Sequence, residues 1–189
     1  MKFHELNDKQ KVKALDKFRD INVDHDNWND SVKEEHTSAL TTIGFECVDS
    51  QYSGFCSQGD GASFSATNVN LETFLRSQKR WSLYRVLHKL IKELVVTASV
   101  SRSGSRYSHS NTTKAELYTY WEDNLTIAQK EKYDELESEL DEFITTAGDN
   151  YYRALEEEYD YLTSDNVVQE TIEANEYDFE VTDNSVTYI

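Results

Sequence analysis

Residues 53–64 read Ser53-Gly54-Phe55-Cys56-Ser57-Gln58-Gly59-Asp60-Gly61-Ala62-Ser63-Phe64. This stretch holds half of the chain's six glycines and separates two segments in which apolar and polar residues alternate. Such alternation is typical of half-buried strands, and a glycine-rich connection can join two antiparallel strands. We therefore predict strands near residues 45–52 and 62–67, joined by this loop.

Two further strands are predicted near residues 94–101 and 105–110. Residues 95–100 are rich in β-branched side chains, and Ser103-Gly104 can turn the chain back on itself. A shorter alternation in residues 177–188 predicts a hairpin.

Helical periodicity covers most of the remaining sequence. Two capping boxes, Thr113–Glu116 and Thr126–Gln129, predict helix starts, and Gly148 is predicted to end the second of these helices. The other predicted helices run from Asn7 or Asp8 to Asn22, from Asp26 or Asn27 to Gly44, from Asn70 to Leu94 with a break near Lys79, from Asp149 or Asn150 to Leu162, and from Ser164 to Asn175. The predicted core includes Phe64, Trp81, Tyr84, Leu87 and Ile91.

These patterns predict an α+β fold, with a small antiparallel sheet packed against several helices and a helical, acidic C-terminal third. The 189 residues contain 38% hydrophobic residues and no proline, which favours a single domain over residues 1–189. No run approaches the length of a membrane span, and the charged N-terminal residues and two cysteines favour a reduced, intracellular protein.

The charge is distributed unevenly along the chain. Residues 117–189 hold 3 Lys and Arg against 21 Asp and Glu, whereas residues 76–106 hold eight basic residues and one acid. The basic segment can pack against the acidic helices within one fold. Alternatively, the acidic third leaves a negative face that attracts basic proteins and repels nucleic acid, with DNA mimicry as the extreme case. The candidate residues of this face are Glu156, Glu157, Glu158 and Asp160.

The sequence gives little support to metal binding or catalysis. Asp24, Asp26, Asp30 and Glu35 fit a calcium-loop template, but Trp28 and Asn29 break it. Histidine and cysteine spacings match no zinc motif, and no nucleotide-binding or nucleophile motif is complete. We expect no metal, no cofactor and no catalytic residue, with nucleophilic catalysis by Cys56 or Ser57 as the weakest alternative.

The glycine-rich loop is a candidate binding site. Glycines allow close backbone approach, and exposed amides can bind an anion. The alternative is a wide hairpin turn with capping side chains. We favour a conformational role for Gly61 and a contact role for Gln58 and Asp60. The candidate binding residues are Ser53, Phe55, Ser57, Gln58, Gly59, Asp60 and Gly61.

Three segments, 17–24, 52–64 and 155–165, resemble a family of small proteins encoded by tailed bacteriophages. The SGFCSQGDGASF motif of the second segment carries most of this resemblance, with Cys56 where a tryptophan is expected. The resemblance implies a phage protein made in the bacterial host cytoplasm. It supplies no catalytic residues.

Two function classes follow. The first is a non-enzymatic phage accessory protein that binds and blocks a basic host protein, for example a defence or toxin protein, through its acidic surface. The second is a sponge that holds an anionic nucleotide-type molecule at the 53–64 loop with help from Arg76, Arg80 or Arg102. An enzyme is a third possibility, and direct nucleic-acid binding is not expected. The sequence makes no prediction of the oligomeric state.

Overall fold

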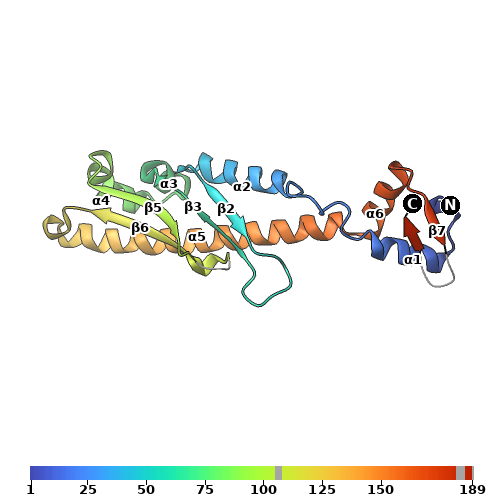
Figure 1. Ribbon diagram of the computed structural model, residues 1–189. Helices are drawn as coiled ribbons and strands as arrows, with labels where there is room; N and C mark the ends of the chain where they lie inside the picture. The colour runs from blue at the N-terminus through green and yellow to red at the C-terminus, as the bar shows by residue number, and fades with distance from the viewer. Residues whose placement is uncertain (105–107, 182–185, 189) are drawn as a thin grey trace. The chain divides into compact units, whose positions relative to one another are not determined.

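The computed structural model describes residues 1–104, 108–181 and 186–188. The chain divides into two compact units, which we describe separately (Figure 1). Unit 1 comprises Met1–Ser31 and Leu155–Ile189, and unit 2 comprises Val32–Ala154. The long helix α5 (Ile127–Leu162) contributes residues to both. The single domain over residues 1–189 stays a prediction.

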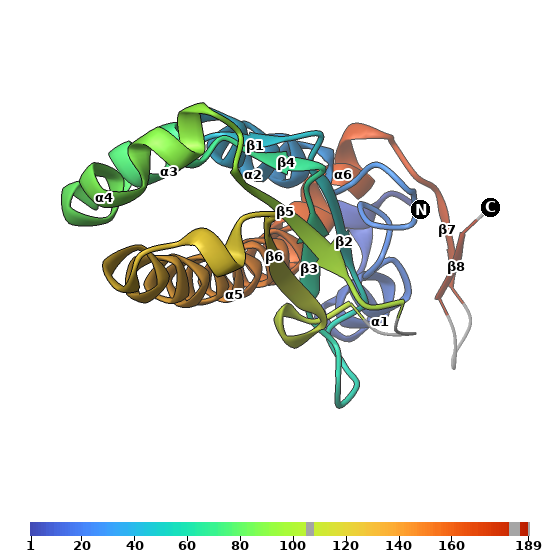
Figure 2. The ribbon, with the colours of Figure 1, turned by 90° about the vertical axis from the view of Figure 1, so that its left-hand side faces the viewer.

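The described residues of unit 2 form six short strands, all paired antiparallel. The pairs are β1 (Phe45–Glu46) with β4 (Asn68–Val69), β2 (Asp49–Tyr52) with β3 (Ala62–Ser65), and β5 (Val96–Arg102) with β6 (Thr113–Thr119). A bridge between Ala66 and Val100 connects the second pair to the third. Figure 2 shows β2, β3, β5 and β6 as one twisted layer beside α5. The predicted α+β class is confirmed.

The helices of unit 2 cover the apolar side of these strands. They are α2 (Asp30–Thr42), α3 (Leu71–Ser77), α4 (Trp81–Lys92) and residues 127–154 of α5, with 3-10 turns at Ser110–Thr112 and Glu122–Asn124. Their most buried side chains meet in one core, which includes Phe45, Phe64, Phe74, Leu83, Leu87, Leu136, Leu140 and Ile144. α3 and α4 are separated where Lys79 adopts a φ of 57°, so the predicted break near Lys79 is confirmed.

The helix predicted from Thr113 and the strand predicted over 105–110 are wrong as placed. Residues 113–119 form β6, which pairs with β5 along its whole length. Residues 105–107 lie outside the described residues, and Ser110–Thr112 is a 3-10 turn. Thr113 and Ala115 are buried while Lys114 and Glu116 are exposed, so the segment has the period of a strand. Pairing with β5 therefore outweighs the local capping-box pattern.

The predicted helix end at Gly148 is also wrong, because α5 continues without interruption to Leu162. A Cβ at residue 148 would lie 3.2 Å from the Ser110 Cβ and 3.3 Å from the Ala62 carbonyl oxygen. The glycine therefore permits close packing of the helix against these residues rather than ending it.

Trp81 was predicted to lie in the core, and this prediction is wrong. Its side chain is 48% exposed, whereas Phe64 and Leu87 are fully buried and Ile91 is 7% exposed. Tyr84 is half-buried. Trp81 is the first residue of α4, and its ring lies beside the Arg76 guanidinium instead of the core.

Unit 1 is built from the two ends of the chain. It contains a 3-10 turn (Phe3–Glu5), α1 (Asp8–Lys17), the last residues of α5, α6 (Asp165–Ala174), β7 (Phe179–Val181) and β8 (Val186–Tyr188). β7 and β8 pair antiparallel, which confirms the predicted hairpin, although its turn at 182–185 lies outside the described residues. α1 ends five residues before the predicted Asn22, and α2 starts at Asp30. The core of unit 1 comprises Phe3, Leu6, Ala14, Leu15, Val168, Ile172 and Phe179.

His36 of α2 is held in an aromatic environment in unit 2. Its ring stacks on Tyr151 with centroids 4.3 Å apart and meets Phe64 edge-on at 5.5 Å. Within the described residues, its Nε2 atom is buried without a hydrogen-bond partner. Burial lowers the pKa of His36 to about 4 and raises the pKa of Tyr151 to about 12. The imidazole is therefore neutral at pH 7.

None of the helices in the described ranges combines the length and the apolar character needed to cross a membrane.

The contrast between Leu87 and Trp81 gives the first prediction. Leu87→Ala should lower the free energy of unfolding by about 2–5 kcal/mol, because it leaves a cavity in the core of unit 2. Trp81→Ala, at an exposed position, should lower it by about 1 kcal/mol or less. Denaturant unfolding of both variants measures the difference. Equal losses would show that our assignment of these two positions is wrong.

A second prediction concerns pH. Because the folded-state pKa of His36 is below that of the unfolded chain, the unfolded state binds more protons as pH falls from about 6.5 to about 4. Stability should therefore be lost over this interval, by about 1–3 kcal/mol from this one group. His36→Phe keeps an aromatic ring but cannot titrate. Its unfolding free energy should fall less than that of the wild type between pH 7 and pH 4, and parallel curves would contradict the assignment.

Candidate functional site

The loop between β2 and β3 is organised by the Asp60 side chain. Its Oδ2 accepts hydrogen bonds from the backbone amides of Cys56 (2.9 Å) and Ser57 (2.6 Å). The Asp60 amide in turn donates to the Ser57 carbonyl oxygen (3.0 Å). Two amides that could have bound an external anion are thus bound by the loop's own carboxylate. The contact role that we expected for Asp60 is not supported, since this side chain is a capping group of the turn.

The three glycines of the loop have two different roles. Gly54 and Gly59 have φ values of 81° and 102°, in the region that favours glycine. Gly61 has no positive φ, and our expectation of a backbone-conformation role for it is wrong. A Cβ at Gly61 would lie 2.9 Å from the Ser108 carbonyl oxygen and 3.0 Å from the His109 Cα. Gly61 is therefore required for close packing.

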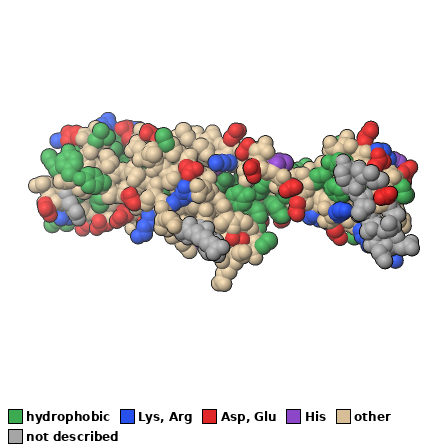
Figure 3. Space-filling view, in the orientation of Figure 1, with side chains coloured by type: hydrophobic (Ala, Val, Ile, Leu, Met, Phe, Trp, Pro, Cys, Tyr) green, Lys and Arg blue, Asp and Glu red, His purple; other side chains and the backbone are tan. Residues whose placement is uncertain are grey.

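The base of the loop is anchored to its surroundings. The Ser53 hydroxyl donates to the Ser108 carbonyl oxygen and accepts from the Ser108 amide, both at 3.1 Å. The Phe55 ring stacks on Tyr52 and lies 5.6 Å from the Tyr152 ring. The tip, with Ser57, Gln58 and Gly59, is exposed, and the loop projects from the surface of unit 2 (Figure 3). Of the predicted binding residues, Ser57 and Gln58 thus keep exposed side chains for an external contact.

The structure does not bring the three candidate arginines to the loop tip. Arg76 binds Glu72 (2.8 Å) and the Tyr84 hydroxyl (3.2 Å), and Arg80 is ion-paired with Glu139. Arg102 binds Asp49 (2.7 Å), which is the first residue of β2. The loop follows the last residue of β2, Tyr52, at the other end of the strand. Each guanidinium is already paired with a carboxylate. This arrangement weakens the case for an anionic ligand at the loop.

The acidic candidates lie on the part of α5 that belongs to unit 1. Glu156, Glu157 and Asp160 are exposed and Glu158 is half-buried. The opposite side of the helix is anchored by the buried Leu155 and by Tyr159, whose ring meets Trp28 edge-on at 5.8 Å. The helix therefore directs these carboxylates into solvent. No ion pair joins them to a Lys or Arg among the residues that the structure describes.

The charge of unit 1 is strongly negative as a whole. Its sequence holds 18 Asp and Glu against 6 Lys and Arg. Internal ion pairs of these basic residues include Lys2 with Asp178, and Arg19 with Asp16 and Asp165. The basic segment of the sequence lies in unit 2, where Arg80 pairs with Glu139 of α5. Both charge arrangements considered from the sequence are thus present in part.

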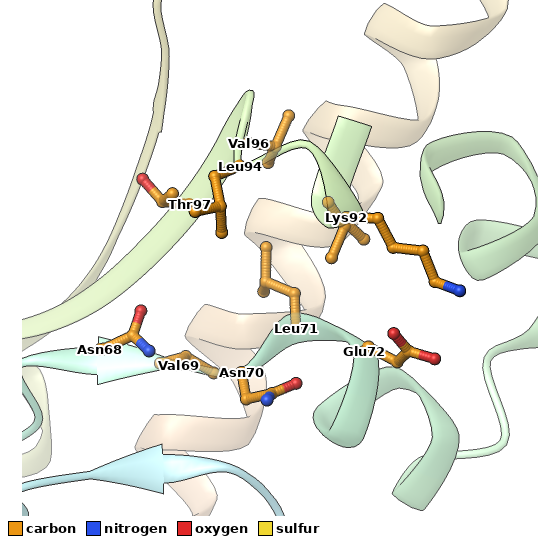
Figure 4. A pocket seen from close by; sticks show the side chains of 10 residues that line it. Asn68, Val69, Asn70, Leu71, Glu72, Lys92, Leu94, Val96 and Thr97 are labelled. Carbon is orange, nitrogen blue, oxygen red and sulfur yellow. The ribbon is translucent and has the colours of Figure 1, made fainter. Parts of the chain in front are cut away.

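Unit 2 also contains a cavity of about 290 Å³ between β4, the first residues of α3, the end of α4 and the start of β5. Figure 4 shows Leu71 directed into its centre, with Leu94 and Val96 above and Asn68 and Asn70 below. Glu72 and Lys92 extend from one side of the cavity. The pKa of Glu72 is lowered mainly by a hydrogen bond from the Tyr84 hydroxyl and secondly by one from Arg76. The polar side chains at the rim are mostly engaged: Asn68 binds Glu46, and Asn70 caps Thr73.

Sequence reasoning did not identify this cavity. Its walls come from four separate elements, so no periodic pattern within one segment indicates it. The described residues contain no cluster of three or more His, Cys, Asp and Glu side chains arranged to hold a metal ion.

Comparison with family models gives a match over most of the chain. A family model described as a domain of unknown function, DUF8835, matches residues 28–165. This range contains all of unit 2, the glycine-rich loop and the acidic residues 156–160. No curated protein and no solved structure matches the chain.

The packing at Gly61 gives a third prediction. Gly61→Ala should lower the free energy of unfolding by about 1–3 kcal/mol, because the new methyl group would press on the backbone of Ser108 and His109. Gly104→Ala is the control, since no described atom lies within 4 Å of a Cβ at that position. Thermal unfolding of the two variants tests this, and an unchanged midpoint for Gly61→Ala would contradict the close approach.

Proposed function

The chain belongs to the DUF8835 family, and on this premise we propose that it is a non-enzymatic bacteriophage accessory protein that binds and blocks a basic host protein through the acidic surface of unit 1. The observation that carries the proposal is the exposure of Glu156, Glu157 and Asp160 on a unit with 18 acidic and 6 basic residues. The resemblance of the glycine-rich motif to phage proteins supports the origin.

The acidic surface has the physical properties of a docking site for a basic protein. Glu156, Glu157 and Asp160 have no ion-pair partner within the part of the chain that the structure describes, and these exposed carboxylates stay solvated until a partner arrives. A surface of one sign speeds the encounter with a surface of the opposite sign, most strongly at low ionic strength. The same field repels the phosphates of nucleic acid, so a protein partner is favoured over DNA or RNA.

An anionic small molecule is the less favoured ligand. The Asp60 carboxylate occupies two amides of the loop, and Arg76, Arg80 and Arg102 are paired with Glu72, Glu139 and Asp49. An anion at the loop tip would therefore have to displace an internal carboxylate or lie close to one, and both cost free energy.

Charge reversal provides the fourth prediction. The triple variant Glu156→Lys, Glu157→Lys and Asp160→Lys should lose capture of its partner from bacterial lysate, with a thermal midpoint close to that of the wild type, because all three side chains are exposed. The matched control reverses three exposed carboxylates of α5 in unit 2, namely Glu131, Glu137 and Asp149, and produces the same change in net charge.

The captured protein should then be purified, and its affinity for the wild type, the triple variant and the control should be measured. We expect capture by the wild type and the control to weaken as salt rises from about 50 mM to about 500 mM, over which the screening length falls several-fold. Capture that survives in the triple variant at both salt concentrations would disprove the electrostatic proposal. Equal loss in both variants would show that the net charge matters and not the surface of unit 1.

A further inference from the structure

Unit 1 contains a cavity of about 370 Å³ that none of the sequence patterns predicted. It lies between the 3-10 turn at Phe3–Glu5 and the end of α6. Its lining residues are Lys2, Phe3, His4, Ile172, Glu173, Glu176 and Tyr177. All of them belong to unit 1, and the volume lies in the range of sites for small ligands or single side chains.

The walls of the cavity combine apolar and aromatic surface with two carboxylates and with the basic residues Lys2 and His4. Phe3 and Ile172 are almost fully buried and form an apolar wall. Tyr177 is half-buried, and its ring stacks on Phe18 with centroids 5.5 Å apart, which holds it in place. The side chains of Glu173 and Glu176 are exposed. A group that fits this lining has an extended apolar stem and a positively charged end.

The backbone at this place also favours a cation. The cavity lies at the C-terminal end of α6, where the aligned peptide dipoles place partial negative charge. The last turn of α6 itself contains no basic side chain, and the Lys2 ammonium reaches the chain just beyond this end from the N-terminal segment. The chain turns sharply there, because Glu176 has a φ of 53°.

Two lysines of unit 1 already show how this region binds ammonium groups. The Lys2 Nζ donates to the Glu176 carbonyl oxygen and to the Asp178 Oδ2 at 3.1 Å. The Lys11 Nζ lies 5.9 Å from the centroid of the Phe3 ring. These contacts use a carbonyl, Asp178 and the Phe3 ring, whereas the carboxylates of Glu173 and Glu176 are not used by either lysine. Glu173 accepts one hydrogen bond from Gln169 (2.9 Å), which fixes its side chain.

We propose that this cavity receives an arginine side chain of the basic partner. The proposal rests on the proposed function and names the chemical group that the partner inserts. A planar guanidinium can lie against an aromatic ring and donate to two carboxylates at once, which a lysine ammonium does less well. The aliphatic stem of the arginine covers Phe3 and Ile172, and its head meets Glu173 and Glu176 beside the negative end of α6.

The test uses the full chain and a defined probe. N-acetyl-arginine methylamide is titrated into the ¹⁵N-labelled protein, with N-acetyl-citrulline methylamide as the neutral probe of nearly identical shape. The arginine probe should shift the amide resonances of residues 2–4 and 172–177, and the citrulline probe should not. Equal shifts from both probes, or shifts confined to residues outside these two ranges, would overturn the proposal.

Variants separate the cavity from the general charge of unit 1. Glu173→Gln with Glu176→Gln should weaken binding of the arginine probe about tenfold or more, because a charged hydrogen bond is replaced by a neutral one. Asp24→Asn with Asp26→Asn removes the same charge from exposed positions of the same unit that belong to neither proposed binding site, and should change the affinity about twofold or less. Unchanged affinity in the first variant would overturn the proposal.

The two proposals can fail separately. If charge reversal at 156, 157 and 160 leaves capture of the partner intact, the proposed function is wrong, and the arginine titration still decides the cavity. If capture depends on those residues but the arginine probe does not bind, the proposed function is supported and the cavity proposal is wrong.

Discussion

The burial of one face of α5 is the constraint on which unit 2 depends. Leu136, Leu140 and Ile144 are completely buried and recur at helical spacing, so this side of the helix completes the core beneath the strands. The residues that flank this face then fix their neighbours. Asp141 accepts a hydrogen bond from the Ala115 amide of β6 (2.9 Å), and Glu139 is paired with Arg80 just before α4. Once the apolar face is buried, the positions of β6 and α4 relative to the helix follow.

The fold could be predicted where the pattern of the sequence and the tertiary environment agree. The strands around the glycine-rich loop, the break at Lys79 and the terminal hairpin are of this kind. The helix predicted from Thr113 is wrong because a capping box is a local signal, whereas pairing with β5 stabilises seven residues of β6 as a strand. The helix end predicted at Gly148 is wrong because a helix can contain a glycine where a neighbouring backbone approaches closely. Both errors come from contacts between residues far apart in sequence.

The candidate sites show the same limit. Exposure of Glu156, Glu157 and Asp160 could be anticipated from their position between Leu155 and Tyr159 on a helix. The roles of Asp60 and Gly61 could not, because one depends on amides that face inward in a turn and the other on the backbone of Ser108. The cavity of unit 1 joins residues 2–4 to residues 172–177, and no periodicity connects segments so far apart.

The hydrogen bond between Asp141 and the Ala115 amide also bears on how the molecule meets its neighbours. Within the described residues β6 pairs with β5 alone, so its other edge carries backbone groups that a strand from a second molecule could use. At Ala115 that edge presents a carboxylate in place of a free donor. An approaching strand would lose a ladder hydrogen bond there and set its own carbonyl oxygen against a negative charge. The Asp141 side chain, which holds α5 against β6, thus also disfavours edge-to-edge aggregation through β6.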